Sequence, residues 1–480
     1  MAGLFGVLDL ASRGMFVVQS SIQTTAHNVA NVDTPGYSRQ RSVLGPAAAI
    51  ATGAGVIGTG VELLTIQRIT DDFVQAQLVR EDSSGSAVRV QAEVLSAVEE
   101  LLNEQLGGGV SGALSKLYSA FADLASATTP GAPVERQGVA TAAQTAVDTF
   151  HSLDSQLRDQ QQRVDLRITQ LVPEINSLLE RIAGFNGEIV RQEVTGPAND
   201  LRDQRDHAVR ELSQLIDVST FESDDGDLVV MIASGLTAVD GVTALGLAVA
   251  PDVSNPFDPT FSRVTFDDGT SQFDITADIG AGSLGGLLRA RDTLLPAAIR
   301  SLDVLAYNLV TSVNAVQTAG VALDGSSGDF FVPLGAVEDA ARDVALDPAI
   351  AANPDKIAAG LTPEPGDNRN ALALAALRDT ASALALPGDP PGPPSGPSRT
   401  LLEHAAAVVA DIGHQVNGLS AAVDQHDRVL EVLEGRRDQV SGVSLDEEMS
   451  NLVRLQAAFQ ANARVLSVVD RLLQDVVAMI

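Results

Sequence analysis

The sequence predicts a mainly α-helical protein with a β-containing insertion, in which N- and C-terminal helices pair as a coiled coil beside a core bundle of long helices. Three observations support this fold class. Apolar residues recur every seven positions at both ends. With 45% hydrophobic but only 4% aromatic residues, the composition favours helices packed on helices. Between residues 217 and 283, short apolar runs alternate with Asp, Gly, Ser and Thr, which predicts a small outer β-rich domain.

Apolar residues in the first thirty positions are spaced alternately by four and three residues. This spacing places a single apolar stripe along one face of a helix. Pro35 and Gly36 then stop the helix and force a turn. The residues of this N-terminal seam are Leu4, Leu8, Ala11, Met15, Val18, Ile22, Thr25 and Val29.

A second seam, formed by two rows with the same seven-residue period, ends the sequence. Ser444 and Glu447 have the spacing of a capping box, so we expect the helix to begin there. Asn462 interrupts the apolar rows, where one polar side chain can fix the register of a helix pair. The C-terminal seam comprises Leu445, Leu452, Leu455, Phe459, Asn462, Leu466, Val469, Leu473, Val476 and Ile480.

The location of the seams, more than their periodicity, indicates their role. Periodicity alone favours the core of an ordinary bundle. Chain ends usually fray, yet here they carry the strongest apolar stripes, and the simplest partner of each stripe is the other end. Isolated helices are marginal in water. We therefore predict termini that are mobile in the monomer and ordered in an assembly.

The composition and the spacing of apolar residues divide the rest of the chain into regions. An internal seam of Ile168, Ile175, Ile182 and Ile189 is assigned to intramolecular packing, with a kink or a restart at Pro173. Helix is expected to resume after about residue 60. The predicted regions are a terminal assembly region (1–40 and 441–480), a helical core (41–216 and 284–440) with an exposed Pro/Gly-rich loop (387–398), a β-rich insertion (217–283) and a short mixed segment (321–366).

Charge and composition narrow the classes of partner. The net charge of −31 repels phosphate backbones and argues against nucleic acid. The absence of cysteine excludes disulfides, thiolate catalysis and cysteine-bound metals. No run approaches the ~18 apolar residues of a membrane span. The N-terminus lacks the basic region and cleavage site of a Sec signal, so export would need another route.

No pattern in the sequence predicts catalysis, a cofactor, a metal site or a small-molecule substrate. Residues 53–58 match the dinucleotide-binding glycine pattern, but an Ala-rich run precedes them and extended texture follows, so we expect a flexible turn. The six histidines show no metal-ligand spacing. Asp446, Glu447 and Glu448 are interpreted as first-turn acids that favour the positive end of a helix. Arg202 and Asp206 are expected to form a surface pair of small value.

Two segments resemble a known family. Residues 28–40 (NVANVDTPGYSRQ) resemble the N-terminal signature of the flagellar axial proteins, the rod, hook and hook-associated group. Residues 441–461 resemble the partner motif of that group. The resemblance singles out Asn28, Asn31, Thr34, Pro35, Gly36, Tyr37, Asp446, Glu447 and Glu448.

Interior segments are similar to those of the hook-associated protein 1 family. They are Ala198–Asp206, Gly285–Leu288 with Arg291 and Asp292, Gly366–Asn368, and Gly58–Val61 with Arg68, Asp71 and Phe73. The stretch from 320 to 366 is short for that family, so any outer domain there is reduced.

The resemblance implies a non-enzymatic, extracellular ring of subunits that joins hook to filament after type III export. Its implied partners are itself, the hook protein, the next hook-associated junction protein and an export chaperone for the C-terminal region. Two alternatives remain open. One is another axial protein of the hook or rod. The other is a secreted enzyme, such as a wall hydrolase, with a catalytic centre within 217–283 or 321–366.

Overall fold

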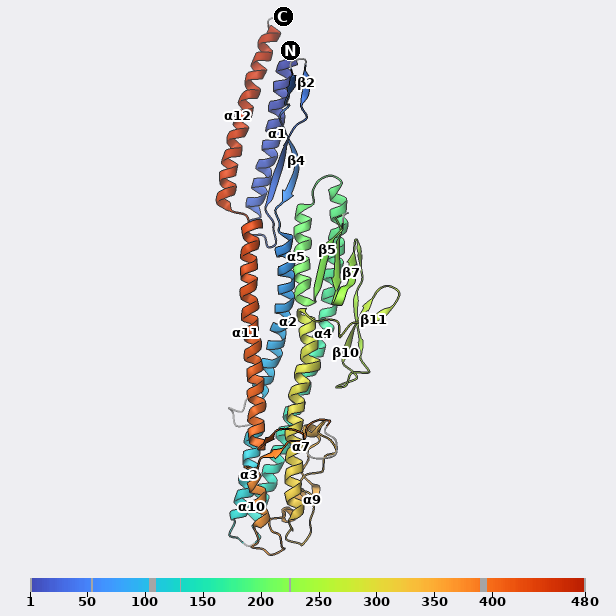
Figure 1. Ribbon diagram of the computed structural model, residues 1–480, viewed down its shortest axis with the longest axis vertical. Coiled ribbons are helices and arrows are strands. Elements are labelled where there is room, and N and C mark those ends of the chain that lie inside the picture. The colour runs from blue at the N-terminus through green and yellow to red at the C-terminus, as the bar shows by residue number, and fades with distance from the viewer. Residues whose placement is uncertain are drawn as a thin grey trace.

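The computed structural model describes residues 2–52, 55–102, 109–129, 131–223, 226–388 and 395–478. The molecule is long and narrow, with both chain ends at one extremity (Figure 1). The mainly α-helical prediction is confirmed. The helices are α1 (Ala2–Ala30), α2 (Asp72–Leu102), α3 (Val110–Ser126), α4 (Pro133–Glu193), α5 (Asn199–Leu215), α6 (Gly282–Arg289), α7 (Leu295–Ala319), α8 (Ala340–Asp343), α9 (Pro348–Ala352), α10 (Arg369–Ala376), α11 (Leu401–Ser441) and α12 (Leu445–Ala478).

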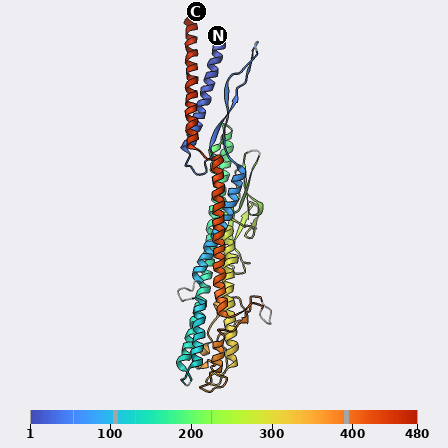
Figure 2. The same ribbon diagram turned by 60° about the vertical axis from the view of Figure 1, so that its left-hand side comes forward.

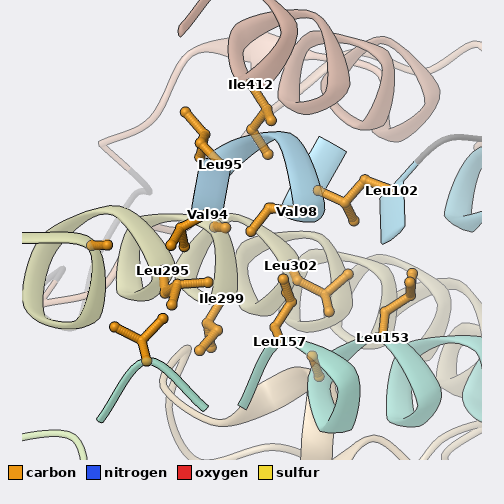
Figure 3. Packing of buried hydrophobic residues seen from close by; sticks show 14 of the residues in the cluster. Val94, Leu95, Val98, Leu102, Leu153, Leu157, Leu295, Ile299, Leu302 and Ile412 are labelled. Atoms are coloured by element: carbon orange, nitrogen blue, oxygen red, sulfur yellow. The ribbon is translucent and has the colours of Figure 1, made fainter. Parts of the chain in front are cut away.

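Helices α2, α4, α7 and α11 form the bundle core and run along much of its length (Figures 1 and 2). The internal seam packs as predicted, since Ile168, Ile175, Ile182 and Ile189 on α4 are all fully buried. Figure 3 shows one layer of this core, where side chains of the four helices meet. The labelled residues are Val94, Leu95, Val98, Leu102, Leu153, Leu157, Leu295, Ile299, Leu302 and Ile412.

Helix α4 contradicts the predicted restart at Pro173. Its 61 residues continue through the proline without interruption. Proline removes one backbone hydrogen bond from a helix interior and crowds the preceding turn. The neighbours Val172 and Ile175 are buried in the bundle, so apolar packing on both sides of the proline holds the helix together there.

Residues 40–68 contradict the predicted return to helix after about residue 60. Strands β1 (Gln40–Pro46) and β4 (Val61–Arg68) pair antiparallel, and beyond them β2 (Ile50–Thr52) pairs with β3 (Gly55–Ile57). The sequence of β4 alternates half-buried and exposed residues along part of its length, which suits a strand packed on one side. We call α1, β1 to β4 and α12 the terminal layer, and α2 to α11 the bundle.

The β-rich insertion lies on the side of the bundle (Figure 1). Its first sheet is a meander of β5 (Val218–Glu222), β6 (Leu228–Ile232), β7 (Leu236–Asp240) and β8 (Thr243–Ala244). Its second sheet contains β9 (Leu247–Pro251), β10 (Ser262–Asp267) and β11 (Gln272–Asp274). The buried Arg291 fastens this sheet, because its Nη1 donates to both Asp165 Oδ1 on α4 and the Ser262 carbonyl on β10, each at 2.6 Å.

The short mixed segment 321–366 folds against the bundle end farthest from the termini. Phe331 and Leu346 form an isolated β-bridge, and the predicted turn at Asp324–Gly325 is present, with Gly325 at a φ of +81°. Strands β12 (Ser382–Ala383) and β13 (Ser398–Arg399) flank the Pro/Gly-rich loop. Residues 389–394 of that loop lie outside the described residues.

Asp303 on α7 should make stability fall as pH rises. Its carboxylate accepts the Ala341 N–H at 2.9 Å, and burial raises its pKa to about 6. The folded chain therefore holds this proton more tightly than the unfolded chain, whose Asp pKa is about 3.9. The stabilisation is complete below pH ~4 and is lost as pH rises through ~6, and it amounts to at most ~3 kcal/mol.

The variant Asp303→Asn keeps an oxygen for the Ala341 N–H but cannot titrate. Urea unfolding between pH 4 and 7.5 should show a smaller stability decrease for this variant than for the native chain. Asp123→Asn, on an exposed position of α3, serves as the matched control. Identical pH profiles for Asp303→Asn and the native chain would contradict the prediction.

Candidate assembly interface

Helices α1 and α12 lie side by side and antiparallel (Figures 1 and 2). Most seam residues are at least half-buried in the single chain. Ala11 on α1 and Val469 on α12 are buried to 0% and 4% exposure. Leu445 is the exception at 48% exposure, and Ile480 lies outside the described residues. The half-buried members are Leu4, Leu8, Met15, Val18, Ile22 and Val29 with Leu452, Leu455, Phe459, Asn462, Leu466, Leu473 and Val476.

Asn462 of α12 packs against Gly14 of α1. A Cβ atom added at Gly14 of α1 would stand 3.2 Å from both the nitrogen and the oxygen of the Asn462 amide. Glycine at position 14 thus makes room for this polar side chain. The contact fits the predicted role of Asn462 in fixing register, which stays a prediction.

Both terminal helices also present large apolar side chains to solvent. Phe16 on α1 is 66% exposed, and Val453 on α12 is 62% exposed. Exposed large apolar side chains are typical of protein–protein contact sites when they gather in a patch. The exposed apolar residues are Phe5, Val7, Leu10 and Phe16 on α1, and Leu445, Met449, Val453, Val465, Val468, Leu472 and Val477 on α12.

The N-terminal signature folds into a compact polar turn after α1. Asn28 is buried at its centre, where Oδ1 accepts the Tyr37 hydroxyl at 2.8 Å and the Gln40 N–H at 2.9 Å. Asn31 Oδ1 accepts the Thr34 hydroxyl at 3.1 Å. After the exposed Pro35, Gly36 has a φ of +80° and lies against the His207 ring, so a side chain there would be strained.

The C-terminal motif meets this turn through Arg39. Its Nε donates to Glu448 Oε1 at 2.6 Å and its Nη1 to Glu447 Oε2 at 2.9 Å. The Arg39 N–H donates to the Ser441 carbonyl at 2.8 Å. Helix α12 begins at Leu445 as predicted, and the Glu447 N–H reaches Ser444 Oγ at 3.5 Å. Interpreting the acids only as a helix-end feature was incomplete, because two of them bind Arg39 while Asp446 lies exposed.

The interior segment Ala198–Asp206 belongs to the bundle and contacts the turn after α1 and strand β4. We call this contact between the terminal layer and the bundle the junction. Asp203 Oδ2 accepts the Ser38 N–H at 2.9 Å, and its Oδ1 accepts Arg68 Nη1 at 3.0 Å. Arg68 Nη1 also donates to Asp206 Oδ2 at 2.6 Å. The predicted pair of Arg202 with Asp206 is wrong, because Arg202 binds Glu193 and Glu222 while Asp206 binds Arg68.

Burial and charge shift several pKa values at this junction. Burial, followed by the nearby Asp200, Asp203 and Glu448, raises the pKa of the Tyr37 hydroxyl well above its usual range. Burial also raises the pKa of Asp203, although bonds from Ser38 and Arg68 oppose that shift. Burial lowers the pKa of Arg68, but Asp206 and Asp203 outweigh it and leave the value raised. The junction is therefore a set of charged groups that stabilise one another.

Across the described part of the chain we also looked for metal sites, membrane-spanning helices and a dinucleotide site. There, no group of three or more His, Asp or Glu side chains is placed to hold a metal ion. No described helix is long and apolar enough to cross a membrane. In the glycine pattern, residues 55–57 form strand β3 and no helix follows, so the helix end that would bind a pyrophosphate is missing; residues 53 and 54 lie outside the described residues.

Sequence reasoning missed the roles of Arg39, Arg68, Gln40, Asp200 and Asp203, although it quoted the segments that contain them. The acids of α5 recur at positions 200, 203 and 206, which places them along one face of that helix. That signal was present. Their partners come from residues more than 130 positions away, and a periodic pattern does not identify those partners.

Family models match two parts of the chain. Residues 95–331 match the model described as flagellar hook-associated protein FlgK helical domain. Residues 437–479 match the model described as flagellar basal body rod FlgEFG protein C-terminal. The first match covers most of the bundle and the β-rich insertion, and the second covers the end of α11 and α12.

Curated relatives align along nearly the whole chain. Flagellar hook-associated protein 1 of Salmonella typhimurium is 27% identical, with 97% of this chain and 98% of the relative aligned. The protein of the same name from Bacillus subtilis is 27% identical, with 99% and 98% aligned. The solved flagellar hook junction protein FlgK from Burkholderia pseudomallei has the same fold, with a TM-score of 0.66 at 17% identity over 76% of this chain and 100% of that one. The chain belongs to the flagellar hook-associated protein 1 family.

Proposed function

We propose that this structural protein of the bacterial flagellum joins the hook to the filament by packing its terminal helices against neighbouring subunits. Family membership supports the flagellar role. The observation that carries the assembly mechanism is the set of large apolar side chains on α1 and α12 that remain 40–72% exposed in the single chain. Burying them between subunits would offset the entropy lost on ordering the chain ends.

The proposal includes the partners and the location that the family resemblance implies. The protein would assemble with itself, the hook protein and the next hook-associated junction protein. It would reach the cell exterior by type III export, with a chaperone that binds its C-terminal region. A non-enzymatic role is part of this proposal.

The two alternatives have less support. The hook-associated helical-domain match over 95–331 argues against a hook or rod component. For a grafted hydrolase, two acids of the β-rich insertion are already engaged: Glu222 binds Arg202, and Asp268 Oδ1 accepts N–H groups of its own turn. Asp224 and Asp225 lie outside the described residues. No specific observation favours either alternative.

Deleting the gene should leave hooks without filaments and release flagellin into the medium. The reason is that flagellin subunits would find no junction on which to polymerise. Electron microscopy of the cells and immunoblotting of the medium measure the two effects, and complementation with the native gene should reverse both. Normal filaments in the deletion strain would contradict the proposed junction role.

A further inference from the structure

An open cavity of about 460 Å³ lies between α2, α7 and α11, in the half of the bundle away from the chain ends (Figure 1). Part of its wall is apolar. Leu95 of α2 and Ile412 of α11, which lie beside each other in Figure 3, contribute to that part together with Leu294, directly before α7. The described residues that line the cavity include none of the terminal layer, so the site does not depend on the order of α1 and α12.

Three basic side chains line the same cavity. Arg399 is on β13, at the start of the chain segment that leads into α11, and His404 and His414 are on α11 itself. None of the three side chains has an ion-pair or hydrogen-bond partner among the described residues, and both ring nitrogens of His404 are buried. Buried polar groups normally have a partner, because leaving one unpaired costs free energy.

The other charged groups around His404 do not neutralise these basic side chains. Asp411 is the one acid among the described lining residues, and its Oδ2 accepts Gln415 Nε2 at 2.7 Å. Beside the cavity, Glu403 accepts the Thr400 N–H at 2.9 Å, and Glu99 of α2 lies against Gly413. The part of the lining before and on α7 and on α2 has no titratable group; it consists of Leu95, Leu294, Ala297, Ala298 and Ser301.

The protonation of His404 should respond to an anion in the cavity. Burial, and then the charge of Arg399, lowers the pKa of His404. At neutral pH the imidazole is therefore uncharged. An anion beside the ring would offset both the charge of Arg399 and the cost of burying an imidazolium, so its binding should be accompanied by the uptake of a proton.

We propose that this cavity binds a small organic carboxylate with an apolar body, such as the anion of a medium-chain fatty acid. Arg399 and His404 bind the carboxylate, since a guanidinium and an imidazolium both donate charged hydrogen bonds to such a group. The apolar wall contacts the hydrocarbon body. An apolar cavity of this size with a few converging polar groups is typical of small-molecule sites. The inference concerns the bundle alone and does not depend on the proposed function.

Octanoate is the probe, added to the full-length chain at pH 6 and at pH 8. The ring Cε1–H signal of His404 in histidine-labelled protein reports binding at the site itself, whereas an amphiphile can also contact the exposed apolar residues of α1 and α12. His404→Gln identifies that signal. Octanoate should move it with a Kd of about 1 mM at pH 6. Affinity should rise as pH falls through the raised pKa of the bound state, so binding at pH 8 should be roughly tenfold weaker.

Two further compounds separate the contributions of charge and of the hydrocarbon body. Octanamide has the same chain without the charge, and sulfate has charge without the chain. Each should bind roughly tenfold more weakly than octanoate at pH 6, because each lacks one of the two contacts.

Variants of the charged lining residues test the assigned contacts. Arg399→Gln should weaken octanoate binding roughly tenfold, and because Arg399 is exposed its loss should leave the fold intact. Asp411→Asn removes a like charge from the cavity and should strengthen binding by roughly threefold. Arg428→Gln is the matched control: it removes an arginine from an exposed position of the same helix, away from the cavity, and should leave the affinity as in the native chain.

Three results would overturn the proposal. A His404 signal that does not move as octanoate is added would mean that the cavity holds only solvent. Octanamide binding as tightly as octanoate would mean that the basic side chains do not recognise a carboxylate. Sulfate binding as tightly as octanoate would reduce the site to an anion contact in which the apolar wall takes no part.

Discussion

Leu466→Asp is expected to abolish incorporation of the protein into the flagellum while the bundle stays folded. Leu466 is half-buried in the C-terminal seam, one turn from the buried Val469, at the surface where α12 packs on α1. A carboxylate placed there would be desolvated without a partner, which costs several kcal/mol and separates the two helices. The amount of protein in purified flagella, relative to that in the medium, should fall by about two orders of magnitude.

Ser467→Asp is the matched control for this experiment. It introduces the same charge one residue later, on an exposed position of α12. It should assemble nearly normally. The thermal unfolding of the bundle should be alike in both variants, since the buried apolar cluster contains no residue of α12. Normal incorporation of Leu466→Asp would rule out the seam as an assembly element.

Gly286→Ala is expected to destabilise the bundle strongly. A Cβ atom at Gly286 of α6 would lie 2.5 Å from the Ala87 carbonyl oxygen and 3.0 Å from its Cα on α2. These are backbone atoms, so the clash is relieved only if the two helices move apart and lose packing along their contact. We expect a loss of ~3 kcal/mol in the free energy of unfolding, measured by urea denaturation.

Gly184→Ala provides the comparison, because it makes the same substitution on an exposed helix position. No heavy atom outside its own helix backbone lies within 4 Å of the added Cβ. This variant should gain ~0.5–1 kcal/mol from lower backbone entropy in the unfolded chain. Equal effects of the two substitutions would show that the α2–α6 approach is not as close as described.

The sequence predicted features that depend on local repeats. Seams on α1, α4 and α12 follow directly from residue spacing, and the β-rich insertion follows from its alternating texture. Features that depend on distant partners were missed. Pro173 does not break α4 because buried neighbours support it, and residues 40–68 form strands because α1 offers a surface on which to pack. The mobility of the termini in the monomer stays a prediction.

The candidate site shows the same division. Spacing predicted the seam residues and a helix that begins at Ser444, and α12 begins at Leu445. It could not show that Glu447 and Glu448 bind Arg39, or that Asp203 of α5 binds Arg68. Those pairings join segments separated by 135 to 409 residues, so only the folded chain brings them together.

The length of α4 has a mechanical consequence for any assembly of this chain. A helix of 61 residues measures ~90 Å, so a rotation of ~5° at one end displaces the other by ~8 Å. The bundle acts as a lever arm that amplifies small angular differences between neighbouring copies into large offsets at the far end. Neighbouring subunits of an assembly would therefore tolerate only a narrow spread of angles at that end.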